Sequence, residues 1–161
     1  MCDAFDCKVV LVLSTQIPLA AVLASYGLEL GTMSAVSNVT VKGAGFRGIF
    51  TNAGSIVSNS TVYGSGSSSL SGLKIRGGGI CSNNRVFASP GSGFVVSTDS
   101  VVTGNTSNAN GSSGFSVFGG VSVISENISN NNGGRGVSFA TSILGAVVAG
   151  NTSNGNGGDG I

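Results

Sequence analysis

Apolar and polar residues alternate in short stretches along this chain, and each stretch begins with a glycine. Seven glycine–apolar pairs recur, at distances of 21, 24, 21, 21, 22 and 24 residues from one pair to the next. The apolar members are Leu28, Ile49, Leu73, Phe94, Phe115, Val137 and Ile161. Two residues further on come Leu30, Thr51, Ile75, Val96, Val117 and Phe139. This period of two predicts a short strand with one buried face.

Each unit then contains two further stretches in the same register. The first is a run such as SIV from Ser55 or SVV from Ser100. Three residues after its last apolar position stand Val39, Ser60, Asn84, Asn105, Asn127 and Asn151, and two residues beyond these stand Val41, Val62, Val86, Ser107, Ser129 and Ser153. A unit of about 22 residues with two or three short strands fits one coil of a parallel β-solenoid. The sequence therefore predicts an all-β domain of about six coils of 21–24 residues over residues 27–161.

In such a solenoid, equivalent residues of successive coils stack on one another along the axis. We expect the apolar columns to lie inside the coil, where Cys81 takes a place that other units give to Val or Ile and so acts as a small core residue. Stacked asparagines can hydrogen-bond along the axis. We therefore expect three asparagine ladders at a corner: Asn84, Asn105, Asn127 and Asn151; Asn108, Asn130 and Asn154; and Asn110, Asn132 and Asn156.

Residues 1–26 do not follow the repeat. They can be an N-terminal cap, with a strand over 9–13 and a short helix over 18–25, or a secretory signal-like segment, although two aspartates near the start argue against a signal. The apolar run is too short to span a membrane. The repeat stops at Ile161 without a visible cap, so we expect a homo-oligomer or further coils to cover that end.

The repeated pattern G-[I/V/F]-x-[V/F], followed by S-x-V and N-x-x-x-x-N-G-G-x-G-[I/V], resembles the right-handed parallel β-helix repeat family of the pectate-lyase-like superfamily. The resemblance covers residues 27–161 and implies a single-stranded right-handed parallel β-helix. The superfamily includes polysaccharide lyases, hydrolases, epimerases, tailspikes, adhesins and members without an assigned activity, so the fold does not fix the function.

Charged residues limit the chemistry that this chain can perform. They make up 8% of the sequence, and the net charge of +1 argues against a nucleic-acid binder. The sequence has no histidine, and its acidic residues beyond residue 26 are Glu29, Asp99, Glu126 and Asp159, each in a different coil. Hydrolysis by paired carboxylates and calcium-dependent lyase chemistry both need clustered acids. We therefore predict no catalytic residues, no metal site and no cofactor, and expect at most a surface ion pair between Arg76 and Asp99.

Basic and aromatic residues are the remaining candidates for a binding surface. Lys42, Tyr63 and Phe87 fall in one column of the repeat, and we predict polysaccharide contacts by Lys42, Arg47, Tyr63, Lys74, Arg76, Arg85 and Phe87. Three functions stay open: a non-catalytic surface or secreted module that contacts polysaccharide, a lyase-type enzyme acting on acidic glycans or a fragment of one, and a structural segment of a longer surface protein. The first and the third place the chain outside the cell or in the cell envelope.

Overall fold

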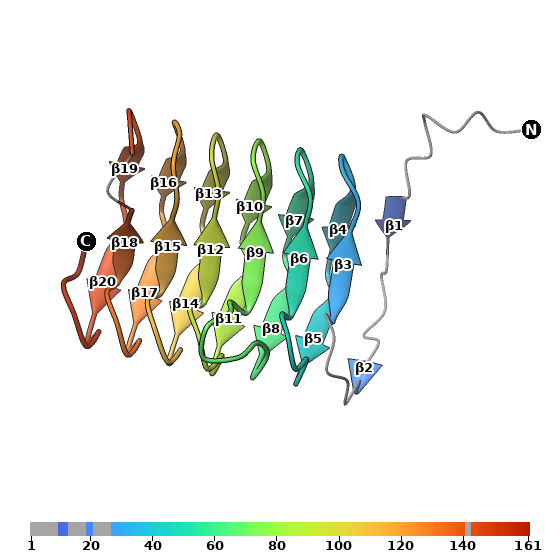
Figure 1. Ribbon diagram of the computed structural model, residues 1–161, viewed down its shortest axis with the longest axis horizontal. Coiled ribbons are helices and arrows are strands. Elements are labelled where there is room, and N and C mark those ends of the chain that lie inside the picture. The colour runs from blue at the N-terminus through green and yellow to red at the C-terminus, as the bar shows by residue number, and fades with distance from the viewer. Residues whose placement is uncertain (1–9, 13–18, 21–26, 141–142) are drawn as a thin grey trace, which may run out of the picture.

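The computed structural model describes residues 10–12, 19–20, 27–140 and 143–161. These residues form three parallel sheets that run side by side along one axis, so the chain is a right-handed parallel β-helix of about six coils, as predicted (Figure 1). The elements assigned within these ranges are all strands.

Each coil visits the three sheets in the same order. Sheet A contains β1 (Val10–Val12), β4 (Ala35–Ser37), β7 (Ile56–Ser58), β10 (Ile80–Ser82), β13 (Val101–Thr103), β16 (Val123–Ser125) and β19 (Val147–Ala149). Sheet B contains β2 (Leu19–Ala20), β5 (Thr40–Lys42), β8 (Thr61–Tyr63), β11 (Arg85–Phe87), β14 (Thr106–Asn108), β17 (Ile128–Asn130) and β20 (Thr152–Asn154). Sheet C contains β3 (Leu28–Leu30), β6 (Ile49–Thr51), β9 (Leu73–Ile75), β12 (Phe94–Val96), β15 (Phe115–Val117) and β18 (Val137–Phe139).

The segment before the repeat adds one strand to each of two sheets. β1 pairs with β4, and β2 pairs with β5, both in parallel. Leu19 and Ala20 therefore form a strand where a short helix was expected, and the rest of the expected helix lies outside the described residues. Whether residues 1–26 form a cap or a cleaved segment stays a prediction.

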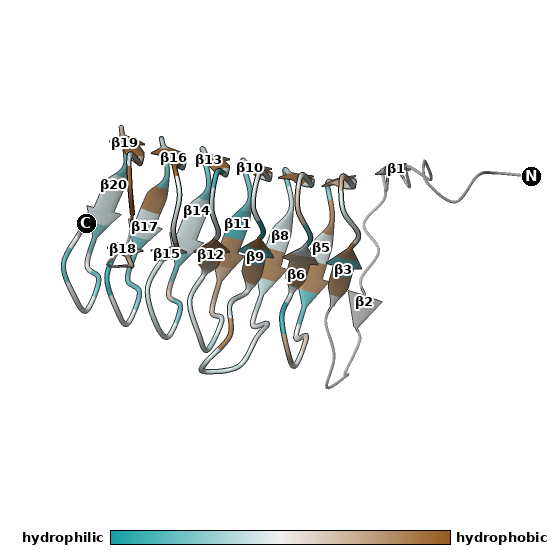
Figure 2. Cartoon of the chain, turned by 45° about the horizontal axis from the view of Figure 1, so that its top comes forward, coloured by the Kyte–Doolittle hydropathy of each residue, from teal (hydrophilic) through white to brown (hydrophobic). Residues whose placement is uncertain are grey.

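From β3 to β18, the middle residue of each sheet A and sheet B strand and the first and third residues of each sheet C strand point into the coil. Ile49, Leu73, Phe94 and Phe115 are fully buried, which confirms the predicted interior column, and Leu28 at its start is partly buried against the core. Figure 2 shows the same separation, with hydrophobic residues on strands such as β6, β9 and β12 and hydrophilic ones on the turns. The rings of Phe94 and Phe115 stack at 4.7 Å between centroids.

Cys81 belongs to this interior, as predicted, and is fully buried. Burial raises the pKa of its thiol to about 12 because a thiolate would be poorly solvated there. The thiol accepts a hydrogen bond from Asn84 Nδ2 at 3.2 Å.

The recurrent glycine before each sheet C strand has a steric cause. A methyl group on Gly93 would overlap Ser107 Oγ, and one on Gly114 would overlap Ser129 Oγ. In the earlier coils the obstacle is a valine methyl group, as for Gly48 against Val62. The chain passes too close to the neighbouring sheet B strand at this corner for any residue with a Cβ atom.

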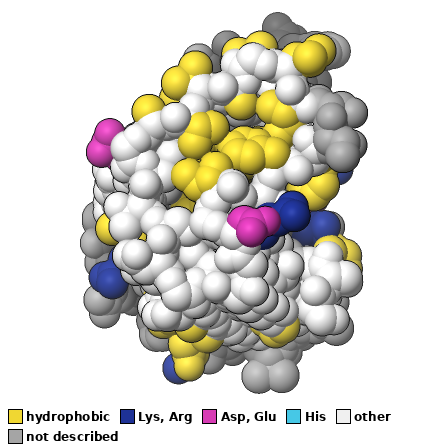
Figure 3. Space-filling view, turned by 90° about the vertical axis from the view of Figure 1, so that its left-hand side faces the viewer, with side chains coloured by type: hydrophobic (Ala, Val, Ile, Leu, Met, Phe, Trp, Pro, Cys, Tyr) yellow, Lys and Arg dark blue, Asp and Glu magenta, His cyan; other side chains and the backbone are white. Residues whose placement is uncertain are grey.

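The end of the solenoid that carries β18, β19 and β20 presents apolar side chains around its centre (Figure 3). Leu144, Val147, Val148 and Ile161 are exposed there. At the same end, Arg135 and Asp159 form an ion pair with 3.4 Å between Nε and Oδ2.

Candidate functional site

The outer face of sheet C brings together three basic residues around one aromatic ring. Phe50 and Lys74 occupy the same outward position on the paired strands β6 and β9. Arg47 precedes β6, and Arg76 follows β9. The guanidinium carbons of Arg47 and Arg76 lie 5.4 Å and 5.1 Å from the centroid of the Phe50 ring. We call Arg47, Lys74 and Arg76, together with Phe50, the basic cluster.

Phe50 organises the cluster. Strand alternation between the interior residues Ile49 and Thr51 turns its ring outward, yet the side chain is only 5% exposed. Guanidinium groups that lie over an aromatic face are held there by cation–π attraction. The ring therefore brings the charges of Arg47 and Arg76 to the side of sheet C that carries Lys74.

Lys74 experiences the charges of both arginines. Its pKa lies below the ordinary 10.5, first because burial disfavours the ammonium ion and then because Arg47 and Arg76 repel it. Neither Lys74 nor Arg76 forms an ion pair with any residue in the described ranges. Lys74 and Arg76 thus carry positive charge that an anionic ligand would offset.

A pocket of about 270 Å³ opens beside Lys74. Its lining combines hydroxyl, apolar and basic side chains: Arg47, Ser69, Leu70, Ser71, Lys74, Val95, Ser97 and Phe118. Ser69, Leu70 and Ser71 come from the long connection between β8 and β9, so the extra residues of this coil form one wall. Hydroxyl and apolar groups beside a cation can hold a sugar ring that carries a carboxylate.

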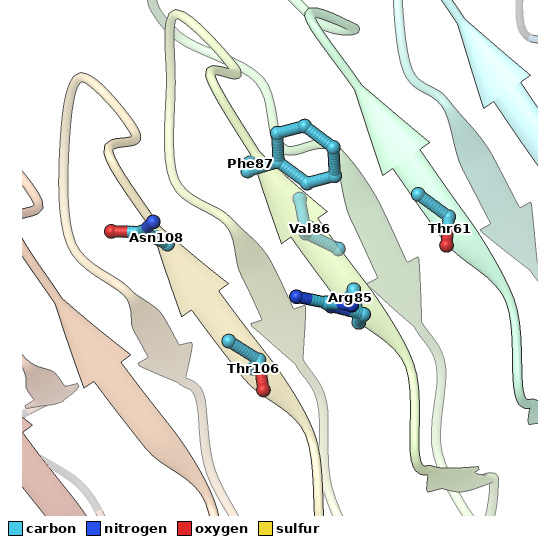
Figure 4. Close-up of a pocket in the computed structure, with 6 residues that line it drawn as sticks. All are labelled: Thr61, Arg85, Val86, Phe87, Thr106 and Asn108. Carbon is cyan, nitrogen blue, oxygen red and sulfur yellow. The ribbon is translucent and has the colours of Figure 1, made fainter.

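The remaining predicted contact residues lie on a different face, the outer side of sheet B. The register places Lys42, Tyr63 and Phe87 in one row, as the repeat predicts. Lys42 Nζ lies 5.3 Å from the centroid of the Tyr63 ring, and the Tyr63 and Phe87 rings lie 4.9 Å apart. Arg85 projects from the same strand as Phe87, beside a pocket of about 330 Å³ (Figure 4). The structure therefore divides the seven predicted residues into two groups.

Asparagines form two rows in the interior of the coil. One row lies at the corner that follows sheet A, and the other lies at the corner that follows sheet B. Asn84, Asn105 and Asn127 each donate from Nδ2 to the Oδ1 of the next asparagine at 3.0 Å, and the row ends at Asn151. Asn110 and Asn132 donate in the same way at 2.9 Å, and that row ends at Asn156. Their Oδ1 atoms also accept from backbone amides, as in Asn84 N to Asn105 Oδ1 at 2.8 Å.

The third expected row is different. Asn108, Asn130 and Asn154 are register neighbours, but they project outward from sheet B and their amides do not hydrogen-bond to one another. Asn108 Oδ1 accepts from Asn131 Nδ2 at 3.5 Å, and Asn130 Oδ1 is buried without a partner. The ladder expected for this set is therefore wrong, because the interior residue of each strand is the serine before the asparagine.

None of the acidic residues that the structure describes forms an ion pair with Lys74 or Arg76. Asp99 Oδ1 accepts a hydrogen bond from the backbone of Val121 at 3.2 Å and forms no ion pair with Arg76, so that expectation is wrong. Glu29 lies in the same sheet C row as Lys74, but Phe50 separates them. The described parts of the chain contain no group of three His, Cys, Asp or Glu residues that could hold a metal ion. They also contain no helix long and apolar enough to cross a membrane.

Comparisons with known proteins identify the fold. No family model matches the chain, and no curated protein matches its sequence. Among solved structures, a double mutant of the periplasmic alginate epimerase AlgG superposes with a TM-score of 0.72 and 19% sequence identity, over 81% of this chain and 33% of that one. This chain thus spans about a third of the length of that protein. At this identity the likeness shows the β-helix fold, and membership of the pectate-lyase-like superfamily stays a prediction.

Proposed function

We propose that this chain is a non-catalytic β-helix module that binds an acidic polysaccharide through the basic cluster on sheet C. The observation that carries the proposal is the convergence of Arg47, Lys74 and Arg76 on Phe50 beside a pocket lined with hydroxyl groups. Burial and, after it, repulsion by Arg47 and Arg76 lower the pKa of Lys74, and a uronate carboxylate would offset that repulsion. The fold neighbour, whose name identifies it as an epimerase of alginate, supports the same class of ligand.

We propose no catalytic activity because few side chains near Lys74 could transfer a proton. The sequence has no histidine, and Asp99 and Glu29 lie away from Lys74 in the structure. Binding a carboxylate does not by itself lower a reaction barrier. The periplasmic location of the fold neighbour favours a place for this chain in the cell envelope or outside the cell.

A lyase-type activity is the second candidate, and the lowered pKa of Lys74 favours it. A lysine whose pKa lies closer to neutrality is a better general base, and flanking arginines could neutralise the carboxylate next to the proton removed. This candidate differs from the first in one observable, the appearance of unsaturated products.

The test measures binding and turnover on the same samples. The purified chain is titrated calorimetrically with polygalacturonate and alginate, with and without calcium, while ultraviolet absorbance and reducing ends are followed. We expect saturable binding that weakens in Lys74→Ala and Arg76→Ala, and no turnover. Turnover that is lost in these variants would establish the lyase candidate instead. A folded chain that binds neither polymer would overturn the proposal and favour a structural segment.

A further inference from the structure

The outer face of sheet B carries a second row of side chains suited to a polysaccharide. Lys42, Tyr63, Phe87 and Asn108 stand one per coil in direct register on β5, β8, β11 and β14. Tyr63 is 39% exposed, and Phe87 beside it is half-buried. The row runs parallel to the solenoid axis, whereas the basic cluster lies on sheet C.

We infer that this row is a second polysaccharide site, an axial track that takes about one sugar per coil. Equivalent residues on neighbouring parallel strands are about 4.8 Å apart. The centroids of Tyr63 and Phe87 reproduce that spacing at 4.9 Å. An extended polysaccharide advances by a similar distance for each pyranose ring, so successive rings of one chain can contact successive side chains of the track. The inference shares with the proposed function the premise that the chain binds glycans, but it uses none of the same residues.

The charges beside the track select an acidic sugar. Lys42 and Arg85 form no ion pair with the residues that the structure describes, and no described outward position of sheet B carries an acid. Arg85 lies between Thr61 and Thr106 on adjacent strands, with Phe87 and Asn108 completing the pocket (Figure 4). A guanidinium can pair with a carboxylate while threonine hydroxyl and asparagine amide groups hydrogen-bond to ring hydroxyls. The aromatic rings supply the apolar surface against which a sugar face packs.

The chain offers a built-in reporter for this face. It contains two tyrosines, Tyr26 and Tyr63, and no tryptophan. In a Tyr26→Phe variant the tyrosine emission comes from Tyr63 alone. Binding at the track then changes this emission, whereas calorimetry records binding at either face.

The experiment titrates Tyr26→Phe with oligogalacturonates of increasing length, and with cello-oligosaccharides of matched length as the neutral control. We expect a saturable change in Tyr63 emission with the acidic series, and an affinity that increases with length up to about four sugars, one for each coil of the track. Adding Phe87→Ala should weaken this response about tenfold, the loss of one anchoring aromatic contact. A circular dichroism spectrum of the Phe87→Ala variant that matches the parent's would show that the fold is intact.

Arg76→Ala in the same background separates the two sites. It should leave the Tyr63 response unchanged, and a loss of the response would show that the emission reports the sheet C cluster and overturn the track. Calorimetric binding with unchanged Tyr63 emission would also overturn the track while leaving the proposed function intact. A Tyr63 response without any effect of Arg76→Ala on total binding would support the track and count against the sheet C site. An equal response to the neutral series would overturn its selectivity for acidic sugars.

Discussion

The guanidinium carbon of Arg76 lies 5.1 Å from the centroid of the Phe50 ring, across two directly paired coils of the solenoid. Phe50 is only 5% exposed, so its ring forms a fixed base for the guanidinium. The contact explains how a chain with 8% charged residues keeps two arginines and a lysine together on one face. It also makes the binding geometry depend on a residue that carries no charge.

Replacing Phe50 with leucine tests this dependence. The leucine keeps an apolar group of similar burial but removes the aromatic face, which is worth about 0.5–2 kcal/mol to a nearby cation. We expect Phe50→Leu to unfold close to the parent and to bind polygalacturonate several-fold more weakly by calorimetry. Unchanged affinity in a folded Phe50→Leu protein would show that the ring does not position the arginines.

The pKa of Lys74 predicts how binding depends on pH. Lys74 loses its charge as the pH rises through a pKa that lies below 10.5, so affinity for an acidic polymer should fall at a lower pH than for an ordinary lysine. In the unfolded chain Lys74 has its ordinary pKa, so between the folded and the unfolded pKa values unfolding takes up a proton. The unfavourable contribution of Lys74 to folding stability therefore becomes smaller as the pH rises through this range. Calorimetric titrations from neutral to alkaline pH should show the decline in the parent and a flatter profile in Lys74→Arg. Identical pH profiles for the parent and Lys74→Arg would contradict a role of the Lys74 charge in binding.

The first asparagine row should contribute strongly to stability. Asn105 Oδ1 accepts from both the backbone and the side chain of Asn84 at 2.8 Å and 3.0 Å, all within the buried corner. Asn105→Ala leaves the backbone N–H of Asn84 without an acceptor and also removes the Asn105 amide from Cys81 O and Asn127 Oδ1, at a cost of about 1–3 kcal/mol for each buried group left unsatisfied. Urea unfolding should show a loss of at least about 2 kcal/mol. Asn108→Ala, on the outer face, should change stability by less than about 0.5 kcal/mol. Equal effects would mean that the row is not a structural element.

The glycine column should be equally sensitive to a single methyl group. Gly93→Ala places a Cβ atom against Ser107 Oγ and Asn110 Nδ2, and overpacking of this kind typically costs about 1–3 kcal/mol. Gly31→Ala is the matched control, because its Cβ would find Ser34 Oγ as its nearest neighbour at 3.6 Å. Thermal melts should therefore separate the two variants clearly. Similar melting temperatures would contradict the close approach of the sheets at this corner.

The repeat in the sequence predicted much of the structure because residues at equivalent positions of successive repeats must stack on one another in a β-helix. Counting positions from each glycine placed Lys42, Tyr63 and Phe87 in one row, and the register of sheet B agrees. The same counting misplaced Asn108, since alternation with the interior Ser107 turns it outward. The period of two within Thr106–Asn108 indicates this outward orientation.

The basic cluster could not be predicted in the same way. Arg47 lies in the connection between sheets B and C, and no periodic pattern determines the path of that connection. The place of Phe50 between Ile49 and Thr51 predicts an outward ring, but it does not predict the contact of that ring with two arginines. Both arginines lie over its ring, an arrangement that only the three-dimensional structure reveals.

A comparison of two arginine variants tests the central claim most directly. Arg76→Ala and Arg135→Ala remove the same charge, but Arg135 lies away from the cluster, in an exposed ion pair with Asp159. Calorimetric titration with polygalacturonate, carried out in a Phe87→Ala background so that the sheet B track contributes little, should show saturable binding by the chain with both arginines, at least about tenfold weaker binding by Arg76→Ala, and binding within about twofold of that chain by Arg135→Ala. Equal weakening of both variants would show that net charge alone attracts the polymer and would contradict a binding site built on Phe50.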